Sequence, residues 1–248
     1  MSDAVVAALC GLIGLLALGV PALIRALPEP PPEELPADPA DDTALEAMLR
    51  AEGPKETYAR VAALPGLAPC SALVAVAVDA AIGARLGDAP VTWVLALVVP
   101  VLVALAVVDW RTRLLPRLVV LPVTGVLVVL ALGEWLVQRD THVLVRTLLA
   151  MVVARSFFWI LWFIRSAGMG FGDVRLAALL GLVLGRLGWN PWIVGLYGGL
   201  LLFGVFGLSL MLIRRDRSTL KQAFPFGPFM IAGAVVGVLL NGSVRLVA

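Results

Sequence analysis

The feature that most constrains this chain is a series of eight apolar segments, several of them near the ~20 residues that a helix needs to cross a bilayer. Apolar residues make up 61% and charged residues 15% of the 248 residues, and the mean hydropathy is +1.00. We therefore predict an all-α, polytopic membrane protein, a bundle of about eight transmembrane helices in contact with lipid. No nucleic-acid partner is predicted. The segments lie at 4–23, 68–86, 91–108, 115–138, 142–164, 173–188, 190–213 and 226–246.

The positions of Lys and Arg predict how these segments are oriented. The first segment has no basic residue before it and ends at Arg25, so it is predicted to be a retained span with an outside N-terminus, rather than a cleaved signal. The loops at 24–67, 109–114, 165–172 and 214–225 then face the cytoplasm. These loops and their flanks hold thirteen of the 19 basic residues: Arg25, Arg50, Lys55, Arg60, Arg111, Arg113, Arg117, Arg165, Arg175, Arg214, Arg215, Arg217 and Lys221. We therefore expect a multi-pass protein of an inner or cytoplasmic membrane, with both termini outside.

The loop after the first segment differs from the rest of the chain. Residues 28–42 read PEPPPEELPADPADD, a run of prolines and acids that predicts a disordered linker. A capping-box spacing at Thr43 and Glu46 then predicts a short amphipathic helix on the membrane surface or against the loops, with a plain solvated helix as the alternative. The predicted organisation is a first span at 1–26, a cytoplasmic linker at 27–67 and a seven-span core at 68–248.

Two aspartates are the candidate functional residues. Asp173 stands in GMGFGDVRL (168–176), where a glycine-rich run meets an apolar segment, and charged groups at membrane depth are usually functional or paired. The glycines permit an unwound backbone, which is tolerated there when protein or a water-filled cavity covers it. Asp109, in VVDWR (107–111), ends the third span. The predicted topology brings both carboxylates to the cytoplasmic face.

Two aspartates that meet in a partly dry site cannot both ionise easily, so they are expected to share a proton. One carboxylate can then take a proton from water while the other hydrogen-bonds or protonates a peptide carbonyl, which is aspartic-protease chemistry. A structural explanation stays open: Asp173 opens a helix, where the helix dipole favours a carboxylate, and Arg111 and Arg113 offer an electrostatic explanation for Asp109. A small transporter or channel component, using both aspartates as a proton or cation site, is the functional alternative.

Three motifs in order resemble those of the type IV prepilin peptidases, membrane aspartyl proteases of the GxGD kind. The stretch 168–176 is similar to the family run ending in G-x-G-D-x-K-L, with Arg175 where lysine is usual. Asp109, followed by LPR at 115–117, resembles the first catalytic aspartate and its downstream Ile-Pro-Asn or Ile-Pro-Asp. PFGPF at 225–229 looks like the family's P-F-G-P motif before the last span. The likeness runs through most of the chain after about residue 55.

This resemblance implies a prepilin leader peptidase, an aspartic endopeptidase that cuts the basic leader from type IV prepilins or pseudopilin-like substrates at the cytoplasmic membrane face. Asp109 and Asp173 would be its catalytic pair. The residues expected to support the site are Gly170, Gly172, Arg175, Pro116, Gly227 and Pro228.

The chain departs from the larger members of that family, which carry two C-x-x-C pairs that bind zinc and which also methylate the new N-terminal residue. Here the loop between the first two spans has no cysteine before Cys70, and the other cysteine, Cys10, lies inside the first segment. We therefore predict a variant without the zinc motif and no metal site. No S-adenosylmethionine site is recognisable, so no cofactor is predicted and N-methyltransferase activity is left open. The pilin system served and the oligomeric state are left open too.

Overall fold

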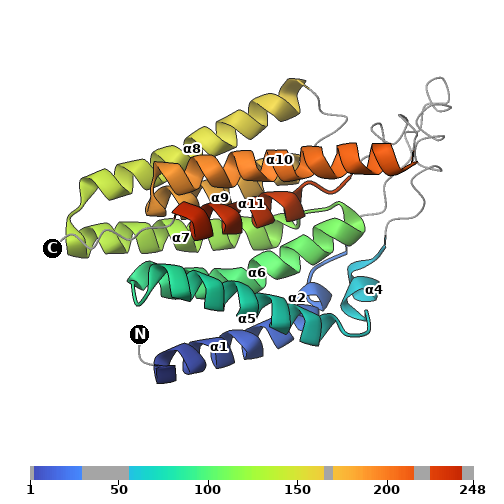
Figure 1. The fold of residues 1–248 in the computed structure, drawn as a ribbon, viewed down its shortest axis with the longest axis horizontal. Coiled ribbons are helices and arrows are strands. Elements are labelled where there is room, and N and C mark those ends of the chain that lie inside the picture. Colours follow the sequence, from blue (N-terminus) through green and yellow to red (C-terminus); the bar gives the residue numbers. More distant parts are fainter. Residues whose placement is uncertain (1–2, 30–55, 165–169, 215–223, 242–248) are drawn as a thin grey trace.

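The structure is a computed structural model that describes residues 3–29, 56–164, 170–214 and 224–241. Within these residues, all regular secondary structure is helical. In chain order the helices are α1 Asp3–Leu18, α2 Val20–Arg25, α4 Tyr58–Ala62, α5 Leu67–Leu86, α6 Pro90–Thr112, α7 Arg117–Gln138, α8 Thr141–Ile164, α9 Phe171–Leu187, α10 Trp189–Arg214 and α11 Gly227–Asn241. Figure 1 shows α1 and α5 on one side of the bundle and α8 and α10 on the other, with α6 between them.

Each of the eight predicted apolar segments overlaps one of the longer helices. Five helices in the described part of the chain, α5 to α8 and α10, are long and apolar enough to cross a membrane. The helices α1, α9 and α11 are shorter, with 16, 17 and 15 residues. The predicted class, an all-α polytopic membrane protein, is confirmed.

The first predicted segment is two helices rather than one. The helix α1 ends at Leu18, and α2 begins at Val20 with Pro21 in its first two positions. Proline has no backbone N–H and clashes with the preceding turn, so it fits the start of a helix better than its interior. The single span predicted at 4–23 therefore contains a break at Gly19, whose N–H bonds the carbonyl of Leu16 at 3.0 Å.

The segment just before the second apolar run packs back on the bundle. Both carboxylate oxygens of Glu29 accept backbone N–H groups at the start of α4, from Tyr58 at 2.9 Å and Ala59 at 2.8 Å. The buried side chains of α4 lie in one cluster with residues of α2 and α6, including Ile24 and Val108. The amphipathic piece predicted up to Arg60 thus ends as a helix packed against other helices; its part at 43–55 lies outside the described residues.

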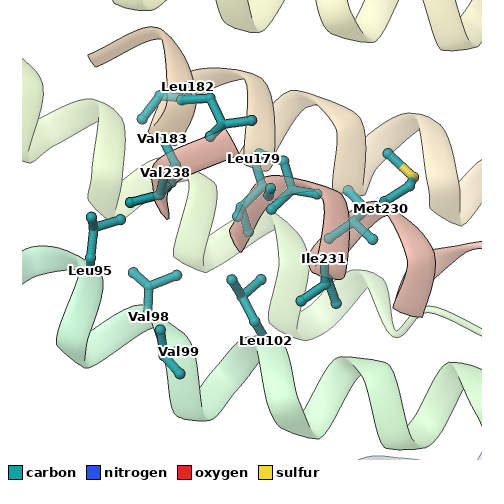
Figure 2. Packing of buried hydrophobic residues seen from close by; sticks show 14 of the residues in the cluster. Leu95, Val98, Val99, Leu102, Leu179, Leu182, Val183, Met230, Ile231 and Val238 are labelled. Atoms are coloured by element: carbon teal, nitrogen blue, oxygen red, sulfur yellow. The ribbon is translucent and has the colours of Figure 1, made fainter. Parts of the chain in front are cut away.

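The main core lies where α6, α9 and α11 meet. Most side chains of α9 are buried, as are more than half of those of α6. Figure 2 shows Leu95, Val98 and Leu102 of α6 turned toward Ile231 and Val238 of α11. The end of α6 and the start of α11 both contribute to the site described below.

Glycines let two pairs of helices approach closely. A Cβ added at Gly181 of α9 would lie 2.7 Å from the Cβ of Ala154 in α8. A Cβ at Gly237 of α11 would lie 2.5 Å from the carbonyl oxygen of Pro191 in α10, and one at Gly233 would collide with the backbone of Gly199. Small residues at such contacts are typical of packed membrane helices. They fix α9 against α8 and α11 against α10.

Candidate active site

Asp109 lies in the last turn of α6, with only 4% of its surface exposed. The helix ends three residues later, at Thr112. The following residue, Arg113, adopts a left-handed conformation (φ 55°) and donates its N–H to the carbonyl of Asp109 at 2.8 Å. The Oδ2 atom of the Asp109 carboxylate accepts a hydrogen bond of 2.9 Å from the backbone N–H of Gly227. A backbone donor from α11 thus compensates for the unfavourable end of the α6 dipole.

Asp173 lies in the first turn of α9 and is 6% exposed. Gly170 is the N-cap, with extended backbone (φ −73°, ψ 146°), and its carbonyl accepts the N–H of Asp173 at 3.1 Å. The position at the start of a helix agrees with the expectation from sequence. It also agrees with the structural explanation, so position alone does not assign a role.

The unwound backbone expected at the glycines is present at Gly170 and absent at Gly172. Gly172 is helical, and the prediction for it is wrong. Its lack of a side chain serves packing instead, since a Cβ there would lie 2.7 Å from the Cβ of Leu115. Leu115 belongs to the short loop between α6 and α7, so this contact holds the start of α9 against the end of α6. Residue 168 lies outside the described residues.

The structure brings the two aspartates together. Both carboxyl groups are buried, and they are near enough for their charges to act on each other. One comes from the end of α6 and the other from the start of α9, so both lie at one end of the bundle rather than in the middle of their helices. The meeting of Asp109 and Asp173 that the predicted topology required is therefore present.

The turn before α11 closes over Asp109. A Cβ at Gly227 would lie 2.7 Å from Oδ2 of Asp109, so only glycine fits without displacing the carboxylate. The neighbouring Phe226 is buried, with its ring 5.0 Å from that of Phe203 and 5.7 Å from that of Phe158. This aromatic packing holds the backbone N–H of Gly227 against the carboxylate.

A second group of aromatic rings surrounds the same turn. Phe229 contacts Phe206 at 5.0 Å and Trp110 at 6.2 Å between ring centres. Sequence reasoning missed Trp110, Phe203 and Phe206 as neighbours of the site. The available signals were the position of Trp110 beside Asp109 and the spacing of three residues between Phe203 and Phe206, which places them on one face of a helix.

The other predicted supporting residues lie around the site without bonding to the aspartates in the described structure. The guanidinium of Arg175 lies over the ring of Phe171, 4.9 Å from its centre. Pro116 is the N-cap of α7 and closes the loop that carries Leu115. Pro228 follows Gly227 in the first turn of α11. These three residues shape the helix ends that carry the site.

Arg111 does not supply the electrostatic explanation considered for Asp109. Its guanidinium donates two hydrogen bonds to Glu56, at 2.8 and 2.6 Å. These bonds lower the pKa of the Glu56 carboxyl from its ordinary value. The cation next to Asp109 in the sequence is thus engaged with the segment before α4.

Among the residues described, no group of three or more His, Cys, Asp or Glu side chains is placed to hold a metal ion. Cys10 and Cys70 are both free thiols. The expectation of no zinc and no other cofactor stays a prediction.

Comparisons with known proteins match this region. Residues 96–212 match the model of the type IV leader peptidase family. A protein of Aeromonas salmonicida named "Prepilin leader peptidase/N-methyltransferase" is 30% identical over 146 residues, 58% of this chain and 48% of that protein. Proteins of the same name from Pseudomonas putida (32% over 157 residues, 60% and 48%) and Dickeya chrysanthemi (32% over 151 residues, 57% and 48%) match similarly.

The chain spans about half the length of these curated relatives. No solved structure matches it significantly. The matched stretch contains both aspartates and ends before Gly227. The resemblance that the motifs indicated is confirmed at the level of the family. Through residues 96–212, the chain is similar to the type IV leader peptidase family.

Proposed function

We propose that this protein is a prepilin leader peptidase, an aspartic endopeptidase that removes the basic leader from type IV prepilins or pseudopilin-like proteins. The observation that carries the proposal is the buried, interacting pair of Asp109 and Asp173, both of which lie in the stretch that matches the leader peptidase family. The name of these relatives, prepilin leader peptidase/N-methyltransferase, supports the same activity.

The proposed mechanism uses the two carboxyl groups with one proton between them. The ionised carboxylate takes a proton from a water molecule, and the water oxygen forms a bond to the carbonyl carbon of the scissile peptide. The protonated carboxyl gives its proton to the carbonyl oxygen. When the resulting tetrahedral carbon collapses, the C–N bond breaks and the proton taken from water passes to the leaving nitrogen. One hydroxyl of the tetrahedral carbon returns its proton to the other carboxylate as the new carboxyl group forms. The pair then carries one proton again.

The hydrogen bond from Gly227 indicates which oxygen of Asp109 takes part. Its N–H occupies Oδ2, so we infer that Oδ1 is the oxygen available to water and to Asp173. A carboxylate fixed in this way is pre-organised, which reduces the reorganisation needed during the reaction. The close packing of Gly172 against Leu115 holds the neighbouring Asp173 in place in the same way.

We propose that the site faces the cytoplasm and that both termini lie outside, in an inner or cytoplasmic membrane. The supporting argument is the positive-inside distribution of Lys and Arg. On this topology the organisation is a first span at 1–26, a cytoplasmic linker at 27–67 and a peptidase core at 68–248. N-methylation is not part of the proposal, because the sequence shows no recognisable S-adenosylmethionine site.

The alternative, a transporter or channel component, is less well supported by the geometry. A proton or cation relay needs acids near the middle of the membrane, whereas Asp109 and Asp173 lie at helix ends on one side of the bundle.

The experiment is cleavage of a purified type IV prepilin by the full-length protein in lipid nanodiscs, with the product identified by mass spectrometry. We expect a single cut directly before the hydrophobic helix of the prepilin. A folded, monodisperse preparation that leaves prepilins and pseudopilins intact, yet dissipates a pH gradient across vesicles, contradicts the proposal and supports the alternative.

A further inference from the structure

A third buried aspartate, Asp79, lies in the middle of α5, a helix long and apolar enough to span a membrane. Only 1% of its surface is exposed, and neither carboxyl oxygen has a hydrogen-bond partner among the residues described. Ser71, on the same buried face of α5, is 3% exposed and its hydroxyl is likewise without a partner there. Buried polar atoms are nearly always hydrogen-bonded, so this face of α5 needs an explanation.

The helices packed against α5 provide no cation for Asp79 in the described structure. They are α1, α2, α6 and α11. Residues 227–241 of α11 contain no titratable group, and those of α6, Asp109 and Arg111, both lie in its last turns. Among the described side chains of α1 and α2 the titratable groups are Cys10 and the exposed Arg25.

The titratable neighbours of Asp79 on its own helix are engaged or distant. Arg85 donates a hydrogen bond to the carbonyl of Leu240 at 3.4 Å, at the end of α5. Cys70 lies near the other end and is exposed. Glu134, another acid within an apolar segment, shows what a paired case looks like, because Arg186 bonds both of its oxygens. Asp79 has no such partner among the residues described.

An unpaired ionised carboxylate in apolar surroundings is strongly disfavoured, and neutralisation by a proton is the ordinary outcome. We propose that Asp79 is a proton-binding site inside the membrane, and that its bound proton keeps α5 packed against α1, α2, α6 and α11. This inference does not depend on the proposed peptidase activity.

The place of Asp79 in the fold gives the proton a structural effect. The helix α5 contacts α1, α2, α6 and α11, and it lies outside the stretch that matches the family model. An ionised Asp79 would need water or a cation beside its carboxylate, and with 1% of the residue exposed we expect these helices to separate to admit either one. The proton on Asp79 therefore stabilises the packing of α5, and this stabilisation is lost as the pH rises and the proton dissociates.

The first test is infrared difference spectroscopy of the full-length protein in lipid bilayers, comparing wild type with Asp79→Asn. We expect the wild type to show the C=O stretching band of a protonated carboxyl at pH 7, shifted in D₂O and absent from the variant. A carboxylate band at pH 7 in its place overturns the proposal. So does a spectrum that changes with sodium or potassium at constant pH, because that response identifies a cation site.

The second test measures thermal unfolding as a function of pH for wild type, Asp79→Asn and Asp79→Leu, with Asp88→Asn as a control at an exposed loop position. For wild type and Asp88→Asn, we expect the unfolding temperature to decrease as the pH is raised from 7 to 9. For the two Asp79 variants, we expect this decrease to be smaller, because the contribution of Asp79 is absent. The leucine variant keeps the test valid if asparagine prevents folding. Identical pH dependence in a folded Asp79 variant and in wild type overturns the proposal.

Discussion

The backbone N–H of Gly227 donates a hydrogen bond of 2.9 Å to Oδ2 of Asp109, although the two residues are 118 positions apart. The donor is held by the aromatic rings around Phe226, and the absence of a side chain on Gly227 lets the two groups approach. This bond joins the end of α6 to the start of α11. The P-F-G-P motif is therefore part of the site, although it lies far from Asp109 in the sequence.

We predict that Gly227→Ala lowers the kcat of prepilin cleavage by about 10- to 100-fold and leaves KM nearly unchanged. The new Cβ would lie 2.7 Å from Oδ2 and displace the carboxylate from its donor. A hydrogen bond to a charged group contributes about 1.5–3 kcal/mol, and each 1.36 kcal/mol of barrier is about tenfold in rate.

Steady-state cleavage kinetics of the purified variant check this prediction. Gly204→Ala is the matched control, because a Cβ there meets nothing within 4 Å. A Gly227→Ala enzyme with the kcat of the control would show that the hydrogen bond does not position Asp109.

We predict that Gly172→Ala reduces cleavage and that a second change, Leu115→Gly, restores part of it. The clash created at Gly172 is with the Cβ of Leu115, so removing that atom relieves it. Residues in direct contact typically show coupling of about 0.5–3 kcal/mol in a double-mutant cycle. The four proteins of the cycle are compared by cleavage rate and by unfolding temperature. Additive effects would mean that this contact does not hold Asp173.

We predict that Glu134→Gln destabilises the protein by about 1–3 kcal/mol, since it leaves the partly buried Arg186 without its charged partner. Arg146 also donates to the carbonyls of Gly185 and Arg186, so this end of α9 is tied to both α7 and α8. Thermal unfolding measures the loss, and Gln138→Ala is the comparison, because it removes the 3.2 Å hydrogen bond from the Gln138 amide to Glu134 while leaving both charges in place. The cleavage rate per folded molecule stays within about twofold; a much larger fall would assign the pair a role in the site.

We predict that the exposed pair of Glu56 and Arg111 contributes stability only above the titration range of Glu56. Its hydrogen bonds to Arg111 lower the pKa of Glu56 in the folded protein. A carboxyl with a lowered pKa stabilises the fold at pH values above its unfolded pKa, and this contribution is lost as the pH falls through the folded one. The test compares the thermal unfolding of wild type and Glu56→Gln between pH 3 and 7, at low and at high salt. The variant lacks the stabilisation that the ion pair gives the wild type. Salt weakens exposed pairs, so an effect that persists at high salt would contradict this account.

The sequence predicted the fold class and the position of every long helix, because apolar segments of this length leave few alternatives. It also placed Asp109 and Asp173 on one face by counting spans. It did not predict the break at Gly19, since a single proline near the end of an apolar run changes hydropathy very little. It assigned Gly172 an unwound backbone, because glycine's freedom is visible in a sequence and a neighbour such as Leu115 is not.

The remaining features depend on contacts between distant segments. The aromatic rings of Trp110, Phe203 and Phe206 meet only when α6, α10 and α11 are packed together. The same packing gives Glu134 its partner and leaves Asp79 without one in the described structure. Both acids lie within predicted apolar segments, and only the arrangement of the helices distinguishes them.

The central claim is that Asp109 and Asp173 act as one catalytic pair, and the most direct measurement is prepilin cleavage by wild type, Asp109→Asn, Asp173→Asn and the control Asp88→Asn. Asparagine keeps the size of the side chain and removes its ability to exchange a proton. General acid and base groups contribute about 10²- to 10⁴-fold each, so we expect each single variant to lose at least about 10²-fold in rate while the control retains wild-type activity. Cleavage at the wild-type rate by either Asp109→Asn or Asp173→Asn would contradict the account.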